Sequence, residues 1–398
     1  IIILIQTLPF ILITANKRLE PAEERAKPKF RQEAIDKFNS LKPKVIAITG
    51  SFGKTSTKHI LNHILSNAAP TLATPGSVNT DMGITRVIRE SLSPDHQYFI
   101  VEMGAYGPGS IARLCQLTPP DIAMISAVGA AHYERFKSLE TVAKAKFEIA
   151  EACFENNGQT IINQNSIPED LLTSRLKAIN GPYIKVGYKG SNLSIKNIKM
   201  TTSGLKIEIN VAGEDHTLKA PLFGQHQGEN IVLAAACANA IGMPWTAIKG
   251  ALLSVPQIKH RLEVIKSSNA PTIIDDAYNS NPIGFASALE CLDILKHPNG
   301  RRILITPGMV ELGNKHNSEH ERLGSIAAKH CDIILVVTPS RIPSFLKGLE
   351  IANNGDVTVM TFDTQQAAED WARSNWRIED VVLFENNLPD IYEADIRL

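Results

Sequence analysis

The stretch VIAITGSFGKTST, residues 45–57, constrains the fold of this chain more than any other part of its sequence. A β-branched, apolar run leads into a glycine turn, and residues 57–69 carry apolar side chains at helical spacing. A strand, a glycine turn and a helix N-terminus form an anion site, because free backbone N–H groups and the helix dipole favour negative charge there. The stretch therefore predicts a phosphate-binding loop within an α/β domain.

The end of this turn supplies the side chains that phosphate binding needs. Lys54 offers a cation to the β- and γ-phosphates of a nucleotide, and the Thr55 hydroxyl is placed to ligate Mg²⁺. The loop is shorter than a full G-x-x-x-x-G-K-[ST] motif, since Ile48 stands where the first glycine would be. The alternative is an ordinary glycine turn with a surface lysine, but the flanking strand and helix favour the phosphate loop.

Length, charge and cysteine content narrow the class of protein. A chain of 398 residues predicts two or three domains, and a hydrophobic fraction of 43% is typical of a globular protein with a proper core. The 41 basic residues balance the 41 acidic ones, which gives no general attraction to nucleic acid. The five cysteines form no C-x-x-C pair, which favours a reducing compartment over a disulfide or structural zinc framework.

Residues 1–15 are apolar except for Gln6 and two threonines, and Asn16, Lys17 and Arg18 follow at once. The run is shorter than the roughly 20 residues of a spanning helix, and no small-residue cleavage site of a signal peptide follows it. Because the sequence starts without methionine, we expect this run to be cut at its outer end. It is then the inner end of a membrane anchor, with the basic residues on the cytoplasmic side. A buried helix is the alternative. Residues 20–44 are charged and predict a linker helix or stalk, so the first unit is 1–43.

From residue 44 onward, short β-rich runs alternate with helical ones, the pattern of a parallel sheet flanked by helices. We expect a central P-loop ATPase domain over residues 44–261. Residues 183–220 predict a β-rich insertion of short antiparallel strands at the edge of its sheet. The expected core strands are 44–49, 98–102, 122–127 and 159–163, and the expected helices are 57–69, 110–116, 139–153 and 230–241.

A second α/β unit follows a natural boundary at residues 256–261. Its alternating pattern predicts a Rossmann-like C-terminal domain over residues 262–398. The expected strands are 272–275, 302–306, 333–337, 358–362 and 381–384, and the expected helices are 284–295, 319–329 and 364–375.

Two polar side chains end neighbouring strands of the central domain. Glu102 ends the strand that begins at residue 98, and His132 follows the strand that begins at residue 122. Ligands of open α/β sheets lie at the carboxyl ends of strands, so both side chains are expected beside the phosphate loop, where they could hold Mg²⁺. A structural role for a lone histidine is the alternative.

The residues alone do not decide the role of three further stretches. Lys146 and Glu148 lie in a helical stretch and are typical of a solvated face. Residues 223–230 form a polar run before an apolar helix, and residues 275–282 are rich in Asp, Asn and Tyr at the end of a strand. The last pattern suits hydrogen bonding to ribose, base or peptide, and equally a turn rich in Asp and Asn.

Taken in order, these motifs resemble the ATP-dependent Mur ligase family, and most closely its UDP-N-acetylmuramoyl-tripeptide–D-alanyl-D-alanine ligases. The likeness runs from about residue 44 to about residue 329, with a weaker tail. Its parts are TGSFGKTSTK at 49–58, residues 79–83, EMG at 102–104, HYE at 132–134, AKFE at 145–148, GQH at 224–226 with Asn230, RLE at 261–263, residues 275–282 and ELG at 311–313.

The resemblance implies a role for each matching residue. Lys54, Lys146 and His132 would be catalytic, and Lys146 matches a lysine that is carbamylated in the family. One Mg²⁺ would lie on Thr55 and Glu102, and a second on His132, with the carbamylated Lys146 as an extra ligand. ATP would contact Gly50, Ser51, Gly53, Lys54, Thr55 and Ser56 through its phosphates, Asn230 through adenine, Arg261 through the γ-phosphate and Asp276 through ribose, with Asn279 and Asn281 near nucleotide or amine substrate.

The implied reaction joins a carboxylate of a muramyl peptide to an amine such as D-Ala-D-Ala, through an acyl phosphate, in peptidoglycan synthesis. A folylpolyglutamate synthase-like ligase with another acceptor is one alternative, and an inactive, membrane-tethered nucleotide-binding partner is another. The sequence departs from the family pattern before the phosphate loop, where only the apolar run and stalk precede it in place of a UDP-sugar domain. It also departs at Thr80, Thr85, Gln227, Gly308 and residues 384–390. These departures affect substrate identity more than ATP chemistry.

Overall fold

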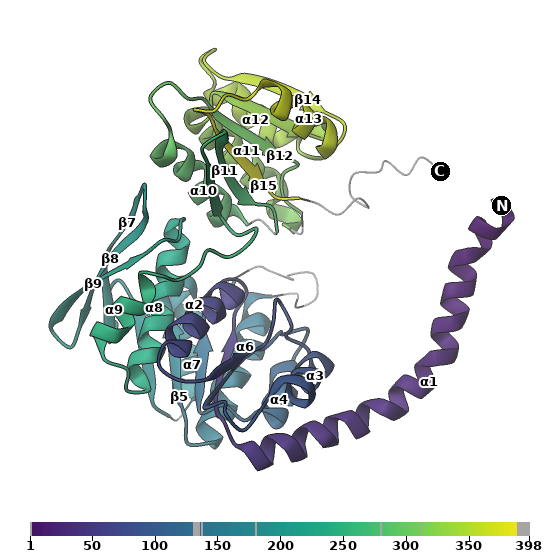
Figure 1. The fold of residues 1–398 in the computed structure, drawn as a ribbon, viewed down its shortest axis with the longest axis vertical. Coiled ribbons are helices and arrows are strands. Elements are labelled where there is room, and N and C mark those ends of the chain that lie inside the picture. Colours follow the sequence, from purple (N-terminus) through teal and green to yellow (C-terminus); the bar gives the residue numbers. More distant parts are fainter. Residues whose placement is uncertain are drawn as a thin grey trace.

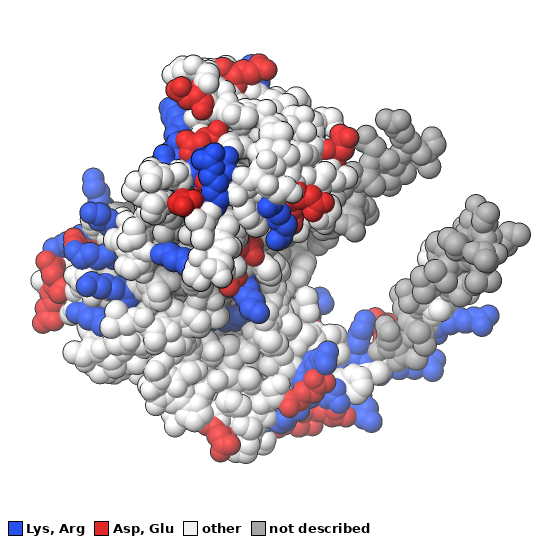
Figure 2. Space-filling view, turned by 45° about the horizontal axis from the view of Figure 1, so that its top comes forward, with Lys and Arg blue, Asp and Glu red and all other residues white. Residues whose placement is uncertain are grey.

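The computed structural model describes residues 2–129, 136, 138–179, 181–278, 281–310 and 312–387. It contains a nine-stranded and a six-stranded sheet, each with helices on its faces, and a long N-terminal helix that stands away from the body (Figure 1). Lys and Arg lie next to Asp and Glu over the face viewed in Figure 2. The charges that balance in the composition are therefore also mixed on this face.

The phosphate-loop strand lies inside the first sheet. β1 (Lys44–Thr49) pairs in parallel with β3 (Tyr98–Glu102) on one side and β4 (Ile122–Ile125) on the other. Its run from Val45 to Thr49 is buried throughout, as a parallel strand covered on both faces requires. The parallel part is completed by β2 (Thr71–Ala73), β5 (Gln159–Asn163) and β6 (Tyr183–Gly187).

The predicted β-rich insertion continues the same sheet. β7 (Leu193–Thr201), β8 (Gly204–Val211) and β9 (Glu214–Ala220) pair antiparallel with one another. β6 differs from the prediction, because it pairs in parallel with β5 and so belongs to the core sheet. Turn residues marked the strand ends but carried no information on strand direction.

Helices cover both faces of the first sheet. Ile46 and Ile48 face the side of α2 (Lys54–Ser66) and α8 (Gln225–Ala240), while Val45 and Ala47 face the opposite side. This alternation divides the core into two layers. α9 (Trp245–Leu252) lies on the first side, and α3 (Asp81–Ser91), α4 (Ser110–Leu117), α6 (Leu139–Glu155) and α7 (Glu169–Ala178) lie on the second, with a short 3-10 turn at Gln164–Ser166.

The second sheet has the strand order β10-β11-β15-β12-β13-β14. Only β10 pairs antiparallel among these strands, so the sheet is mixed, and the α/β class expected for both domains is confirmed. The strands are β10 (Glu263–Ser267), β11 (Ala270–Asp276), β12 (Arg302–Thr306), β13 (Ile333–Val337), β14 (Thr358–Phe362) and β15 (Val381–Glu385). The helices are α10 (Pro282–Leu295), α11 (His316–His330), α12 (Pro343–Ala352) and α13 (Gln365–Asn375), with 3-10 turns at Gly313–Lys315 and Pro339–Arg341.

The apolar run and the expected stalk form one continuous helix, α1 (Ile2–Leu41). Its last turns pack on α3, where Phe38 is buried, and Arg89 lies over the ring of Phe30 and 2.8 Å from the Glu33 carboxylate. Within the part of the chain that the structure describes, no helix is both long enough and apolar enough to cross a bilayer. The boundaries 1–43, 44–261 and 262–398 remain predictions.

Candidate active site

Two positions of the phosphate loop, Gly50 and Gly53, leave no room for a side chain, and Gly53 also has a left-handed backbone conformation. Gly53 has φ +80° and directly precedes α2. A Cβ on Gly53 would lie 2.5 Å from Asn230 Oδ1, and a Cβ on Gly50 would lie 1.9 Å from Ser126 Oγ. α2 begins at Lys54, three residues before the predicted start, because Lys54, Thr55 and Ser56 form the first turn of the helix.

The end of β4 fixes the loop through hydrogen bonds that the sequence did not suggest. The Ser51 N–H donates to Ala127 O at 2.9 Å, and the Gly129 N–H donates to Ser51 Oγ at 2.9 Å. The Ser126 hydroxyl donates to Thr49 O at 3.2 Å and also to Phe52 O. These contacts span more than seventy residues of sequence, so only the folded sheet reveals them.

Lys54, Thr55 and Glu102 come together as predicted. Lys54 Nζ donates to Gly50 O at 2.6 Å, which folds the side chain over the loop, and burial lowers the pKa of its ammonium. The Thr55 hydroxyl donates to Glu102 Oε2 at 3.0 Å. The Glu102 carboxylate is buried at the end of β3, whose pairing with β1 sets Ile48 opposite Glu102. A hydroxyl and a carboxylate oxygen are ligand types that Mg²⁺ prefers.

Two more residues hold the Glu102 carboxylate. Lys58 Nζ lies 2.9 Å from Glu102 Oε2 and also donates to Gly76 O, and the Asn79 amide donates to Glu102 Oε1 at 3.2 Å. The motif runs contained both residues, but no role was predicted for either. A lysine at one oxygen of a buried carboxylate compensates its charge, which an isolated buried carboxylate could not tolerate.

Lys146 is buried in α6 rather than solvated, which corrects the interpretation from residues alone. Its side chain is only 4% exposed. Burial, together with the nearby charge of Lys54, lowers the pKa of Lys146 to about 7. Glu148 is not part of a purely solvated face either, since its two oxygens accept the backbone N–H groups of Gly109 at 2.6 Å and Ala112 at 3.0 Å, at the start of α4.

Asn230 lies beneath the phosphate loop. α8 begins at Gln225, five residues before the predicted start, so the polar run is its first turns. Asn230 Oδ1 accepts the Thr57 hydroxyl at 3.3 Å, and its amide donates to Gln227 Oε1 at 3.0 Å. Gln227 reaches Ser56 Oγ at 3.4 Å. The adenine contact implied for Asn230 remains a prediction.

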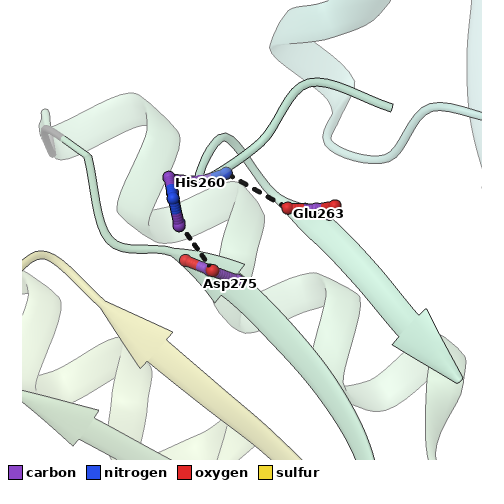
Figure 3. A group of neighbouring side chains, drawn as sticks. All are labelled: His260, Glu263 and Asp275. Atoms are coloured by element: carbon purple, nitrogen blue, oxygen red, sulfur yellow. Dashed lines mark hydrogen bonds and ion pairs between the residues drawn. The ribbon is translucent and has the colours of Figure 1, made fainter. Parts of the chain in front are cut away.

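Arg261 lies in the segment that joins α9 on the first sheet to β10 of the second sheet, which we call the Arg261 hinge. Figure 3 shows the three side chains His260, Glu263 and Asp275 beside it. His260 at φ +59° and Leu262 at φ +53° flank it, both in the left-handed region. His260 Nδ1 lies 2.8 Å from Asp275 Oδ2, and the His260 N–H donates to Glu263 Oε2 at 3.3 Å. Ligand atoms of His260, Glu263 and Asp275 lie within 4.8 Å of one another. Their mutual hydrogen bonds account for the arrangement, and we describe the group as a hinge brace.

Asp276 and Asn281 both have protein partners at the end of β11. Asp276 Oδ1 accepts the Leu262 N–H at 3.0 Å, and burial raises the pKa of Asp276 to about 6 against the opposing effects of Leu262 and Arg261. Asn281 caps α10, because its Oδ1 accepts the N–H groups of Ile283 at 3.1 Å and Gly284 at 3.0 Å. Their expected contacts with ribose and substrate remain predictions.

Two predicted site residues, His132 and Asn279, lie outside the described residues. The second Mg²⁺ site implied for His132 therefore also remains a prediction. The described part of the site still places Lys54, Thr55 and Glu102 at one strand edge, with Lys146 close enough to Lys54 for their charges to interact.

Comparisons with known proteins agree with this arrangement. Residues 48–238 match the Mur ligase middle domain, and residues 260–385 match the family described as "Mur ligase, glutamate ligase domain". A UDP-N-acetylmuramoyl-tripeptide–D-alanyl-D-alanine ligase from Buchnera aphidicola subsp. Baizongia pistaciae is 34% identical over 286 residues, which are 71% of this chain and 60% of that protein. The ligase of the same name from Escherichia coli strain K12 is 32% identical over 288 residues, with coverages of 71% and 62%.

The fold comparison extends over more of the chain. The crystal structure of MurF ligase from Thermotoga maritima in complex with ADP superposes with a TM-score of 0.76 at 26% identity, covering 91% of this chain and 80% of that one. This chain spans about three fifths of the length of the two curated relatives named above. The two domain matches follow one another along the chain, and with a relative 34% identical over 71% of its length, the chain belongs to the Mur ligase family.

Proposed function

We propose that this chain is an ATP-dependent, ADP-forming ligase of peptidoglycan precursor synthesis that joins a muramyl-tripeptide carboxylate to D-Ala-D-Ala. The observation that carries the proposal is the cluster at the end of β3, where the Thr55 hydroxyl lies 3.0 Å from Glu102 and both lie beside the phosphate loop. The similar proteins named as UDP-N-acetylmuramoyl-tripeptide–D-alanyl-D-alanine ligases support the choice of substrates.

The reaction needs an activated acid, because a carboxylate has only oxide to expel when an amine attacks. Attack of a carboxylate oxygen on the γ-phosphorus of ATP breaks the bond to the β-phosphate oxygen and gives an acyl phosphate and ADP. An amine then attacks the acyl carbon, which releases phosphate and, after loss of a proton, gives the amide. The loop N–H groups and Lys54 would bind the phosphates and offset the repulsion between carboxylate and triphosphate.

Thr55 and Glu102 would hold the Mg²⁺ expected of this family, and their oxygen atoms fit its preference. When bound, the ion would add positive charge at the phosphoryl group. Lys58 would then keep Glu102 from carrying an uncompensated charge when nucleotide is absent, and Asn79 would keep the carboxylate oriented.

Carbamylation of Lys146 is part of the proposal. A lysine with a pKa of about 7 holds much of its side chain as a neutral amine near neutral pH, and the neutral amine is the form that attacks CO₂. The nitrogen bonds to the carbon of CO₂ and releases a proton, which turns a cation into a carboxylate-like metal ligand. Burial disfavours the cationic form and so raises the share of the neutral amine from which this conversion starts.

Release of inorganic phosphate from ATP tests the function. We expect release with UDP-N-acetylmuramoyl-tripeptide and D-Ala-D-Ala together, and only background release with either alone. Release that needs a different acid or amine would support the related-ligase alternative instead. Nucleotide binding without release for any acid and amine pair would support the inactive nucleotide-binding partner.

We also propose a cytoplasmic location, supported by the ATP chemistry and by five buried cysteines with free thiols. Contact of residues 1–15 with the inner face of the cell membrane is a separate prediction that rests on their apolar sequence. Fractionation of the chain with and without residues 1–15 tests it. Equal amounts in the membrane fraction would contradict the contact.

A further inference from the structure

The backbone of Arg261 is held by the end of β11. His260 and Leu262 adopt left-handed conformations on either side of it, and each is tied down by a different hydrogen bond. Leu262 N–H donates to Asp276 Oδ1 at 3.0 Å, and His260 O accepts the Tyr278 N–H at 3.2 Å. The position of the Arg261 Cα is therefore fixed relative to the second sheet, while its long side chain needs a separate support.

Tyr278 supplies that support. The Arg261 Cζ lies 4.5 Å from the centroid of the Tyr278 ring, which is the geometry of a cation–π contact. The tyrosine side chain is 52% exposed, so it contributes little to the core, and a stable fold does not explain its position. Stacking reduces the number of conformations open to the guanidinium and so directs it before any nucleotide arrives.

The Tyr278 hydroxyl also reaches the first domain. It lies 2.9 Å from Ser77 Oγ. Ser77 belongs to a loop that is held on both sides of it, because Gly76 O accepts Lys58 Nζ and Asn79 donates to Glu102. The residues around the Glu102 carboxylate are thus connected through this loop to Tyr278 in the second domain, and through Tyr278 to Arg261 at the boundary between the domains.

We infer that Tyr278 is a positioning residue that holds the Arg261 guanidinium by stacking and fixes it relative to the phosphate loop through the Ser77 hydroxyl. The inference rests on the proposed function, in which Arg261 meets the γ-phosphate. It adds that the placement of Arg261 depends on a contact between the two domains. Loss of the hydroxyl bond should therefore act only on steps that involve the γ-phosphate.

Nucleotide affinity tests this without depending on turnover. Isothermal titration of the full chain with ADP and with a non-hydrolysable ATP analogue gives the part of the affinity that the γ-phosphate supplies. Tyr278→Phe and Ser77→Ala should each weaken binding of the ATP analogue by about three- to tenfold, the effect of one hydrogen bond, and leave ADP affinity unchanged. Tyr278→Leu removes the ring as well and should come close to Arg261→Ala.

A double-mutant cycle and matched controls separate the outcomes. The Ser77→Ala, Tyr278→Phe double variant should lose no more than either single variant, because both remove one bond. Ser77→Thr keeps a hydroxyl and should restore binding, and Tyr183→Phe, at an exposed tyrosine on β6, should have no effect. Losses that multiply in the double variant, or equal losses for ADP and the ATP analogue, would overturn the inference.

Arg261→Ala distinguishes this inference from the proposed function. If Arg261→Ala weakens binding of the ATP analogue but Tyr278→Phe does not, Tyr278 has no positioning role and the inference fails alone. If Arg261→Ala changes neither nucleotide, the γ-phosphate role of Arg261 in the proposed function fails. In either case, phosphate release measured with both substrates reports separately on ligase activity.

Discussion

The phosphate loop and the Arg261 hinge serve the same proposed reaction but are built differently. The loop is fixed by close contacts at Gly50 and Gly53 and by hydrogen bonds from the end of β4. The hinge is exposed at His260 and Tyr278 and depends on a few hydrogen bonds and one stacked ring. We conclude that the loop is preformed for phosphate, whereas the contribution of the second domain depends on weaker contacts that single substitutions can remove.

The largest expected effect on turnover comes from the buried Lys146, which lies near Lys54 of the phosphate loop. Lys146→Ala should reduce turnover by about a thousandfold or more, since it removes the proposed carbamate ligand, and high bicarbonate should not restore it. Phosphate release under both conditions measures this. Lys144→Ala, an exposed lysine two residues away on α6, is the matched control and should be close to wild type. Near-normal turnover in Lys146→Ala would rule out the carbamate.

The loop glycine should come next. Gly53→Ala places a Cβ 2.5 Å from Asn230 Oδ1 in a left-handed conformation, so we expect at least about tenfold weaker nucleotide binding and a loss of about 1–3 kcal/mol in the free energy of unfolding. Titration with ATP and denaturant unfolding measure the two effects. Gly190→Ala is a control for conformation alone, since Gly190 has φ +64° and no atom within 4 Å of an added Cβ. Equal losses in the two variants would show that packing against Asn230 is unimportant.

In the Arg261 hinge, substitution of Asp276 should give a pH-dependent effect on the free energy of unfolding. Burial raises the pKa of Asp276 to about 6. Between about pH 4 and pH 6 the carboxyl group is therefore protonated in the native state but ionised in the unfolded chain. This contribution to the free energy of unfolding is therefore present at low pH, falls as pH rises through that range, and stays lost above it.

Asp276→Asn should remove this slope, with a difference of about 2 kcal/mol across the range. Urea unfolding at a series of pH values measures it. Burial lowers the pKa of His226 to about 4, which gives the opposite slope in the same range, so the wild type must be subtracted at each pH. Parallel curves for wild type and variant would contradict the assignment.

The exposed hinge brace should give the smallest effect. His260→Ala removes the contact with Asp275, but the His260 ring is mostly exposed, so we expect about 0–1 kcal/mol in the free energy of unfolding. Its effect on the ATP analogue should be smaller than that of Tyr278→Leu. A loss larger than that of Gly53→Ala would mean that the hinge is as rigid as the loop.

Local patterns predicted the elements better than the contacts between them. The stretch around Gly53 predicted strand, turn and helix correctly because all three are encoded within a few residues. The starts of α2 and α8 were placed too late, since Lys54 to Ser56 and Gln225 to Gln227 are polar residues of first helical turns. Neither apolar spacing nor a preceding capping side chain marked those turns.

Long-range partners could not be predicted from the residues. Glu102 was expected at the strand edge because its strand could be recognised, but Ser126, Lys58 and Asn79 gained their partners only through the arrangement of strands and loops. Lys146 gave no signal of burial apart from the family resemblance, because α6 carries charged residues on both sides of it. The Ser77–Tyr278 contact joins residues 201 positions apart and has no sequence pattern.

Transfer of ¹⁸O from the substrate acid to phosphate tests the central claim most directly. Both oxygens of the muramyl-tripeptide carboxylate that is joined to the amine are labelled. Phosphate released in the presence of ATP and D-Ala-D-Ala should then carry one ¹⁸O per molecule, because one carboxylate oxygen attacks the γ-phosphorus and leaves with the phosphate. Phosphate that carries no label from the acid, and takes its oxygen from water instead, would contradict activation of the acid by phosphorylation.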